Sequence, residues 1–194
     1  MSSGEAEEIR RFLAGDEGAF QLIMHRWYRP IVNFLYRCTG SQDDAAELAQ
    51  ETFQTVSRRL GDLKDPARFS SWIYKIALNH SRMRMRKQRN RKMESLDAQT
   101  FENNELKDSY QSLTLSTSLS PEERLSKQEM AQVVRQALDR IEPKQREVIV
   151  LKEYSGLRFH EIAEVLDAPI STIKSRMYLG LESLRREIIK IIRP

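Results

Sequence analysis

Apolar residues recur at intervals of three and four along almost every patterned part of this chain, and this spacing is the strongest constraint on its fold. It places the apolar side chains on one face of an α-helix. The first such stripe, between residues 19 and 38, comprises Phe20, Ile23, Met24, Trp27, Ile31, Phe34 and Leu35. Pro30 lies inside this stripe and is expected to kink the helix near Arg29. We therefore expect an all-α protein.

Two further helices are predicted in the first half of the chain. Ser41 followed by Asp44 is a helix start signal, and Gly61 marks the end of that helix. Its apolar face comprises Ala45, Leu48, Ala49, Thr52, Phe53, Val56 and Leu60. Asp65 and Pro66 then open a connection into a third helix, whose buried stripe comprises Phe69, Trp72, Ile73, Ile76 and His80. Helices that bury each other's stripes form one compact unit, which we expect to end near Lys92.

The helical periodicity fails between Met93 and about Ser120, where a flexible connector is expected. Side chains typical of extended or unstructured segments gather there, at 103–104 and 116–118. The composition, 40% apolar and 31% charged over 194 residues, suits a globular protein of one large domain or two small ones. We therefore predict two small helical domains, at 1–94 and 123–194, joined by a flexible acidic linker at 95–122.

After Pro121 the helical pattern returns. One helix carries Met130, Val133, Val134, Ala137, Leu138 and Ile141, and Pro143 is expected at the first position of the next, which carries Val148, Ile149 and Leu151. The segment from Arg158 to Leu184 then predicts a helix-turn-helix. Its first helix would pack through Ile162, Ala163 and Leu166, its turn would span 167–169, and its second helix would be capped by Ser171 and anchored by Ile173, Met177 and Leu184.

The second helix of this motif is expected to lie in the major groove of DNA. Five polar or aromatic side chains remain available near its N-terminal part: Thr172, Lys174, Ser175, Arg176 and Tyr178. Lysine and arginine can bind phosphates or guanine edges, and hydroxyl groups can pair with either. The alternative is an ordinary helical hairpin with charged solvent faces, because the helix-turn-helix pattern is degenerate.

The charges are unevenly distributed although the net charge is only +4. Seven basic and no acidic residues lie between Arg82 and Lys92, and eight acidic residues follow between Met93 and Ala131. Uncompensated positive charges repel one another, so a polyanion such as nucleic acid is the favoured partner of the basic run. The acidic, Ser/Thr-rich tract fits a solvated linker.

Two helix faces of the first domain are candidate binding surfaces. Opposite its buried stripe, the third helix carries Ser71, Tyr74, Lys75, Leu78, Asn79 and Arg82. An aromatic ring and an amide among cations can hold an unstacked base, although Tyr74 could instead pack and Asn79 could merely end a helix. The second helix presents Asp44, Glu47 and Glu51 in line, with Gln50 and Gln54 beside them. This acidic face suits a basic protein partner or is simply solvated surface.

Several classes of function are excluded or disfavoured. A single cysteine, Cys38, leaves no internal disulfide, and His25, His80 and His160 lack metal-ligand spacing, so we expect no metal. No nucleophile–base pair or phosphate loop is present, so we expect neither an enzyme nor a cofactor. Neither a membrane span nor a signal peptide is apparent, which predicts no membrane insertion and a cytoplasmic location.

Four segments together resemble the small sigma factors of bacterial RNA polymerase, the extracytoplasmic-function group. Residues 44–53 resemble the family's polymerase-binding helix, and 69–79 its promoter-melting helix, followed by a basic stretch. Residues 137–149 resemble the entry to its second domain, and 161–163 with 173–176 match its minus-thirty-five reader. The resemblance covers nearly the whole chain and has the four segments in the family's order.

The resemblance implies a sigma factor that binds core RNA polymerase and directs promoter-specific initiation, assisting promoter melting while catalysis stays with the polymerase. The implied polymerase-binding residues are Asp44, Glu47, Leu48, Gln50, Glu51 and Phe53. Those implied at the minus-ten element are Lys64, Arg68, Trp72, Tyr74, Lys75, Asn79, Arg82, Arg84, Arg86 and Lys87. Those implied at the minus-thirty-five element are Arg158, Ser171, Thr172, Lys174, Ser175, Arg176 and Tyr178. The implied partners are the clamp of the largest polymerase subunit, the flap, promoter DNA and an anti-sigma factor.

The chain departs from the family pattern in two regions. The usual acidic pair of the clamp helix is here Ala46-Glu47, and Leu179, Gly180 and Leu181 stand where the family commonly has further arginines. Fewer arginines mean fewer phosphate contacts at the minus-thirty-five element. The alternative function is a stand-alone helix-turn-helix regulator that binds operators, with the first domain for a ligand or for dimerisation. A lone, unrepeated basic helix and the lack of a dimer seam argue against it.

Overall fold

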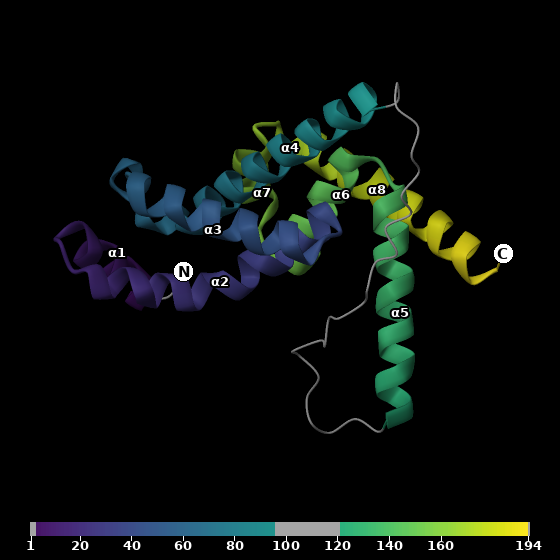
Figure 1. Ribbon diagram of the computed structural model, residues 1–194, viewed down its shortest axis with the longest axis horizontal. Helices are drawn as coiled ribbons and strands as arrows, with labels where there is room; N and C mark the ends of the chain where they lie inside the picture. Colours follow the sequence, from purple (N-terminus) through teal and green to yellow (C-terminus); the bar gives the residue numbers. More distant parts are fainter. Residues whose placement is uncertain (1–2, 96–120, 194) are drawn as a thin grey trace.

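The structure, a computed structural model, describes residues 3–95 and 121–193, and all regular structure within these ranges is helical (Figure 1). The first half contains α1 (Ser3–Leu13), α2 (Glu17–Thr39), α3 (Gln42–Arg59) and α4 (Phe69–Ser95), with the 3-10 turns η1 (Leu60–Asp62) and η2 (Pro66–Arg68) between α3 and α4. The second half contains α5 (Pro121–Arg140), α6 (Pro143–Ile149), the π-helical turn η3 (Val150–Tyr154), α7 (Phe159–Leu166) and α8 (Ile170–Ile192). The predicted all-α fold is confirmed.

The predicted linker, residues 95–122, falls mostly outside the described residues. At the start of the predicted linker, Ser95 is the last residue of α4, and near its end Pro121 is the first residue of α5. The division into domains at 1–94 and 123–194 therefore stays a prediction.

Local capping chemistry starts and stops the helices close to where the sequence predicts. The Ser41 hydroxyl oxygen accepts a hydrogen bond of 3.2 Å from the backbone N–H of Asp44, which caps α3. Gly40, with φ of +72°, supplies the left-handed residue that ends α2. Pro143 occupies the first turn of α6, where a missing N–H costs nothing. Helix α2 continues through Pro30 as a single element.

Helices α1 to α4 form one bundle. The stripes predicted for α2 and α3 supply its core, including Ile31, Phe34 and Val56, all at most 1% exposed. Helix α1, which the sequence did not predict, packs on α2. Ile9 of α1 is 1% exposed, and the Glu5 carboxylate accepts a hydrogen bond of 2.6 Å from the Trp27 indole N–H.

Helices α7 and α8 form the predicted helix-turn-helix. Ile162, Leu166, Ile173 and Met177 are buried as expected. Asp167 ends α7 with φ of +50°, a left-handed conformation that aspartate tolerates better than most residues.

One local feature of α8 contradicts a prediction from the sequence, and a second was not predicted. Ser171 is not its N-cap, because α8 begins at Ile170 after Pro169, and Ser171 lies inside the first turn. Gly180 faces α6, and a Cβ atom there would lie 3.0 Å from Cδ1 of Ile149 and 3.1 Å from Cβ of Gln145, so a larger residue would force these side chains or α8 to shift.

The two halves of the chain pack against each other. Helix α4 lies against α7 and α2 against η3, and the buried side chains of both halves form one continuous cluster (Figure 1). At this contact the Arg37 guanidinium lies 4.0 Å from the centre of the Tyr154 ring, and Arg135 donates a hydrogen bond of 3.1 Å to the Tyr36 hydroxyl. Helix α4 is consequently covered on two sides, by its own bundle and by the C-terminal half.

Candidate functional site

A groove runs between α2 and α3 beside the acidic face of α3. It has a volume of about 920 Å³ and is lined by Phe20, Met24 and Tyr28 from α2 and by Ala46, Glu47, Gln50, Phe53, Gln54, Ser57 and Arg58 from α3. The sequence predicted the acidic face but assigned Phe20 and Met24 wholly to the core. Both are only partly buried, and Tyr28 is 44% exposed. An apolar groove with a carboxylate and amides on its rim suits a helix that carries apolar and basic side chains.

The predicted polymerase-binding residues of α3 divide into exposed and buried groups. Glu47 and Gln50 are exposed and Glu51 is half-buried. Leu48 and Phe53 were expected on the same surface, but they are 1% and 3% exposed, which places both side chains in the core. Their spacing along α3 puts them on its apolar stripe, and the ring of Phe53 stacks on Tyr28 at a centroid distance of 6.1 Å in the groove wall.

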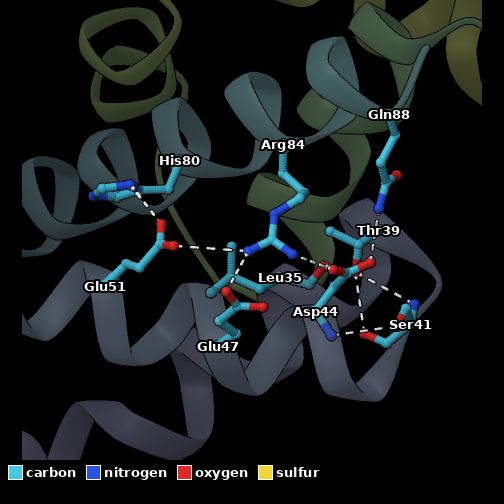
Figure 2. A network of polar contacts seen from close by, with 9 residues as sticks. All are labelled: Leu35, Thr39, Ser41, Asp44, Glu47, Glu51, His80, Arg84 and Gln88. Carbon is cyan, nitrogen blue, oxygen red and sulfur yellow. Dashed lines mark hydrogen bonds and ion pairs between the residues drawn. The ribbon is translucent and has the colours of Figure 1, made fainter. Parts of the chain in front are cut away.

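A polar network joins α3 to α4 beside this groove, with Arg84 at its centre (Figure 2). The Arg84 guanidinium lies 2.7 Å from the carboxylate of Asp44, 2.8 Å from that of Glu47 and 3.7 Å from that of Glu51. The pKa of Arg84 is raised, mainly by its hydrogen bond with Glu47. Partial burial acts in the opposite direction, and the negative charges of Glu47, Asp44 and Glu51 raise the pKa further. Arg84 was predicted to contact DNA, but here its side chain points to α3.

Two further residues complete the network (Figure 2). Gln88 donates a hydrogen bond of 3.1 Å to Asp44, so both carboxylate oxygens of Asp44 are engaged by α4. Nδ1 of His80 lies 3.2 Å from the Glu51 carboxylate, and Nε2 of the same ring lies 3.1 Å from the Thr55 hydroxyl. The side chain of Asp44 is 19% exposed, so its carboxylate connects the two helices rather than facing a partner as predicted.

The face of α4 predicted to hold DNA is partly exposed and partly covered. Lys75, Asn79, Arg86 and Lys87 are exposed, and Trp72 is half-buried. By contrast, three side chains placed on the same face by the sequence are buried: Ser71 at 5%, Tyr74 at 2% and Leu78 at 1% exposure. The expectation that these three are exposed is wrong, because neighbouring helices cover this side of α4: Ser71 contacts Glu164 of α7, and Tyr74 packs against α2.

Tyr74 belongs to an aromatic cluster rather than to an open platform. Its ring centre lies 5.9 Å from that of Trp27 and 5.1 Å from that of Phe34, both edge to face. Burial raises the pKa of the Tyr74 hydroxyl, and a hydrogen bond with Ser155 of the C-terminal half acts in the opposite direction. In this arrangement its hydroxyl group is a contact between the two halves.

Acidic residues of the C-terminal half bind cations of the predicted minus-ten surface. Glu147 of α6 accepts two hydrogen bonds from the Arg82 guanidinium, at 2.8 and 2.6 Å, and these are the main cause of a raised pKa of Arg82. Glu164 of α7 lies 3.6 Å from Arg68 and accepts a hydrogen bond of 3.3 Å from the Ser71 hydroxyl. The carboxylates thus occupy positions that phosphate oxygens would otherwise take. The sequence did not single out either glutamate.

Lys64 and Arg68 precede α4, and both are exposed. Arg68 also lies 3.9 Å from Asp65, which is a long distance for an ion pair between exposed side chains. Both cations lie on the surface next to the start of α4, and of the two Arg68 also lies 3.6 Å from Glu164.

The helix-turn-helix leaves most of its predicted contact residues accessible. Ser171, Lys174 and Ser175 are exposed, Tyr178 is 75% exposed, and Thr172 and Arg176 are half-buried at the base of the same face. Arg158 is exposed at the start of α7, where its backbone N–H donates a hydrogen bond of 2.6 Å to the Glu161 carboxylate. Leu179 and Leu181 are about half exposed on the next turn, and the exposed residues Glu182, Arg185 and Arg186 follow further along α8.

Other candidate chemistry is sparse in the part of the chain that the structure describes. No group of three or more His, Cys, Asp or Glu side chains there could hold a metal ion. Cys38 is buried, and burial raises the pKa of its thiol to about 12. Within the same residues, no helix is long and apolar enough to span a membrane.

Comparisons with known proteins match both halves of the chain. The family model for Sigma-70 region 2 matches residues 23–91, which include the polar network, most of α4 and the groove residues except Phe20. The model for Sigma-70, region 4, matches residues 131–184, which include the helix-turn-helix.

Curated relatives match over almost the full chain. The ECF RNA polymerase sigma factor SigW of Bacillus subtilis is 30% identical over 182 residues, covering 94% of this chain and 95% of the relative. The ECF RNA polymerase sigma-E factor of Escherichia coli is 27% identical over 189 residues, covering 95% of this chain and 94% of the relative.

Solved structures share the fold. The sigma factor RpoE of Bartonella quintana, in complex with the anti-sigma factor NepR, aligns with a TM-score of 0.68 at 23% identity, covering 90% of this chain and 98% of that one. CnrH in complex with the cytosolic domain of CnrY aligns with a TM-score of 0.65 at 20% identity, covering 94% of this chain and 95% of that one.

Proposed function

The chain belongs to the extracytoplasmic-function sigma factors of bacterial RNA polymerase, and from this premise we propose which of its surfaces perform each step of initiation. A sigma factor binds core RNA polymerase and directs transcription to specific promoters, and this is the function of the chain. The stand-alone regulator is not favoured, because both sigma regions match in order along one chain.

The groove between α2 and α3 is the proposed binding site for the clamp of the largest polymerase subunit. The single observation that carries this proposal is an apolar groove with Glu47 and Gln50 on its rim. All residues that line the groove come from α2 and α3, so the packing of the C-terminal half on α4 leaves it open. A basic, partly apolar helix would satisfy both the apolar floor and the carboxylate of Glu47 at the edge.

Helix α4 is the proposed minus-ten surface. Its exposed cations and amide, above all Lys75, Asn79, Arg86 and Lys87, would hold the non-template strand, with Lys64, Arg68 and Trp72 beside them. Holding a flipped base offsets an unstacking cost of about a few kcal/mol per base, so promoter melting needs binding energy and no catalytic residue. Arg82 can join this surface only when Glu147 releases it, and we propose that the C-terminal half moves away from α4 on the polymerase.

Helix α8 is the proposed minus-thirty-five reader. Lys174, Ser175 and Tyr178 extend from its N-terminal half, where recognition helices meet base edges. Leu179 and Leu181, which directly follow this part of the helix, are exposed and hold no phosphate. The polymerase would supply the remaining affinity for the promoter.

Family membership also suggests the remaining properties and partners of this chain. Sigma factors are non-catalytic initiation factors, and we propose that this chain leaves catalysis to the polymerase, needs no cofactor and acts in the cytoplasm. The flap of the polymerase is the proposed contact of the C-terminal half. RpoE is in complex with the anti-sigma factor NepR, and by likeness we propose such a partner here.

The proposed clamp site is tested by titrating fluorescently labelled core polymerase with the full chain and two single variants. Gln50→Ala changes the groove rim and should weaken binding to core about tenfold, a loss of about 1.4 kcal/mol, which is within the range found for interface residues that contribute to binding. Lys75→Ala changes the exposed face of α4 and should weaken promoter opening rather than binding to core. Equal binding to core by Gln50→Ala and the unchanged chain would place the clamp site elsewhere.

A further inference from the structure

Arg84 differs from the other cations of its basic run in where its side chain lies. Its neighbour Arg86 is exposed and makes no ion pair within residues 3–95 and 121–193. The side chain of Arg84 is 23% exposed and contacts carboxylates at three successive positions on one face of α3 (Figure 2). The basic run therefore contains cations that face solvent and at least one, Arg84, that binds carboxylates of α3.

The three carboxylates need a cation between them. Asp44, Glu47 and Glu51 follow one another at intervals of three and four, and like charges at this spacing repel each other on a helix. The Arg84 fork lies 2.7 Å from Asp44 and 2.8 Å from Glu47, so it spans the first two carboxylates at once. Lysine could not reproduce this geometry, because its ammonium group is a single point of charge.

The three carboxylates are held to different degrees. Asp44 is engaged by Arg84 and Gln88, and Glu51 by His80 together with the longer Arg84 contact. Glu47 is 58% exposed, and within the described residues Arg84 is the group that holds its carboxylate. The orientation of the Glu47 carboxylate therefore depends on Arg84 more than the orientations of the Asp44 and Glu51 carboxylates do.

Glu47 stands at the boundary between two hollows of the surface. It lines the groove of about 920 Å³ with Phe20 and Met24, and it also lines a cavity of about 340 Å³ with Arg84 and His80. Arg84 binds the carboxylate of Glu47 from the cavity side. This leaves the groove side of the carboxylate open to a basic group that enters the groove.

We propose that Arg84 is a positioning residue for polymerase binding, which holds the carboxylate of Glu47 at the edge of the groove and that of Glu51 beside it on the same face of α3. The inference rests on the proposed clamp site. A carboxylate that is already oriented loses less side-chain freedom when the partner binds, so the positioned pair binds a basic helix more tightly than a free pair would. Arg84 leaves the cluster net negative, because it is one cation among three carboxylates.

The test is a double-mutant cycle on binding to core polymerase. The variants are Arg84→Gln, the pair Glu47→Gln with Glu51→Gln, and all three substitutions together. We expect the glutamate pair and Arg84→Gln each to weaken binding to core by about tenfold, and the triple variant to bind no more weakly than the glutamate pair. Such non-additivity is the signature of a residue that acts through another.

Three further variants separate positioning from other roles. Arg84→Lys keeps the charge but loses the fork, and it should weaken binding to core by about threefold while it unfolds at the same temperature as the unchanged chain. Arg10→Gln removes an exposed ion pair with Glu7 in α1 and should leave binding to core unchanged. Arg86→Gln reports on DNA, so it should weaken binding of holoenzyme to a minus-ten single strand more than Arg84→Gln does.

Two results would overturn the inference and can be told apart. If the glutamate pair weakens binding to core but Arg84→Gln and Arg84→Lys do not, or if their effects add in full, Arg84 does not position these side chains. If the glutamate pair itself binds core normally, the clamp site is wrong and the inference fails with it. Thermal unfolding of each variant shows whether a loss of binding comes from a loss of fold.

Discussion

The ion pair between Arg82 and Glu147 is predicted to hold the C-terminal half of the free chain against α4. The variant Glu147→Gln keeps the shape of the side chain and removes its charge. Hydrogen bonds to charged groups contribute about 1.5–3 kcal/mol, and fully exposed ion pairs about 0.2–1 kcal/mol. The side chain of Glu147 is 13% exposed and that of Arg82 is 43% exposed, so this ion pair lies between a buried charged hydrogen bond and a fully exposed ion pair. We therefore expect the substitution to weaken the packing of the two halves by about 1–2 kcal/mol.

A loss of this size moves the balance between packed and separated halves about tenfold toward the separated state. Small-angle scattering of the free chain should give a larger radius of gyration for Glu147→Gln. Because the substitution also releases Arg82, binding of a minus-ten single strand by the free chain should become tighter by up to the same factor. Raising the salt concentration should reduce both differences.

The weaker contact of Glu164 provides an internal comparison. Its distances to Arg68 and Ser71 are 3.6 and 3.3 Å, so Glu164→Gln should change the radius and the single-strand affinity less than Glu147→Gln does. The reasoning would be refuted if Glu147→Gln left both quantities as in the unchanged chain. It would also be refuted if the radius grew while the affinity for the single strand fell.

Three other substitutions test separate parts of the account. Asn79→Ala should slow open-complex formation while binding to core is retained, and unchanged transcription from the cognate promoter would rule out a base contact by this side chain. Lys174→Ala should cost roughly 1 kcal/mol of binding at the minus-thirty-five element, and an equal loss on a scrambled element would mean that it holds only phosphate. Gly180→Val should lower the free energy of unfolding by about 2 kcal/mol, because its side chain would overlap Ile149, whereas Gly4→Val in open space should not. Equal unfolding midpoints for the two glycine variants would contradict the close packing of α8 on α6.

Patterns within one helix could be predicted from the sequence, because they depend on neighbours a few residues away. The cap at Ser41, the start of α6 at Pro143 and the buried face of the helix-turn-helix are of this kind. The acidic residues Glu47 and Glu51 were also recognised as a surface feature. Helical periodicity and capping chemistry were sufficient for each of these predictions.

Contacts between distant segments could not be predicted in this way. Tyr74 and Leu78 were assigned to an open face, because nothing near them in sequence reveals that α2 packs against Tyr74 or that α7 lies against α4. Arg84 could not be distinguished from Arg86, since its partners on α3 lie more than thirty residues earlier in the chain. Leu48 and Phe53 were assigned to a binding surface by family resemblance, although their own spacing had already placed them on the buried stripe.

Promoter-specific initiation by the purified chain with core polymerase tests the central claim most directly. Transcripts made by core polymerase with and without the chain would be mapped to their start sites on genomic DNA. The account predicts starts that depend on the chain and that share one minus-ten and one minus-thirty-five element at fixed spacing. Starts that do not change when the chain is added, together with tight and specific binding of duplex DNA by the free chain, would contradict it.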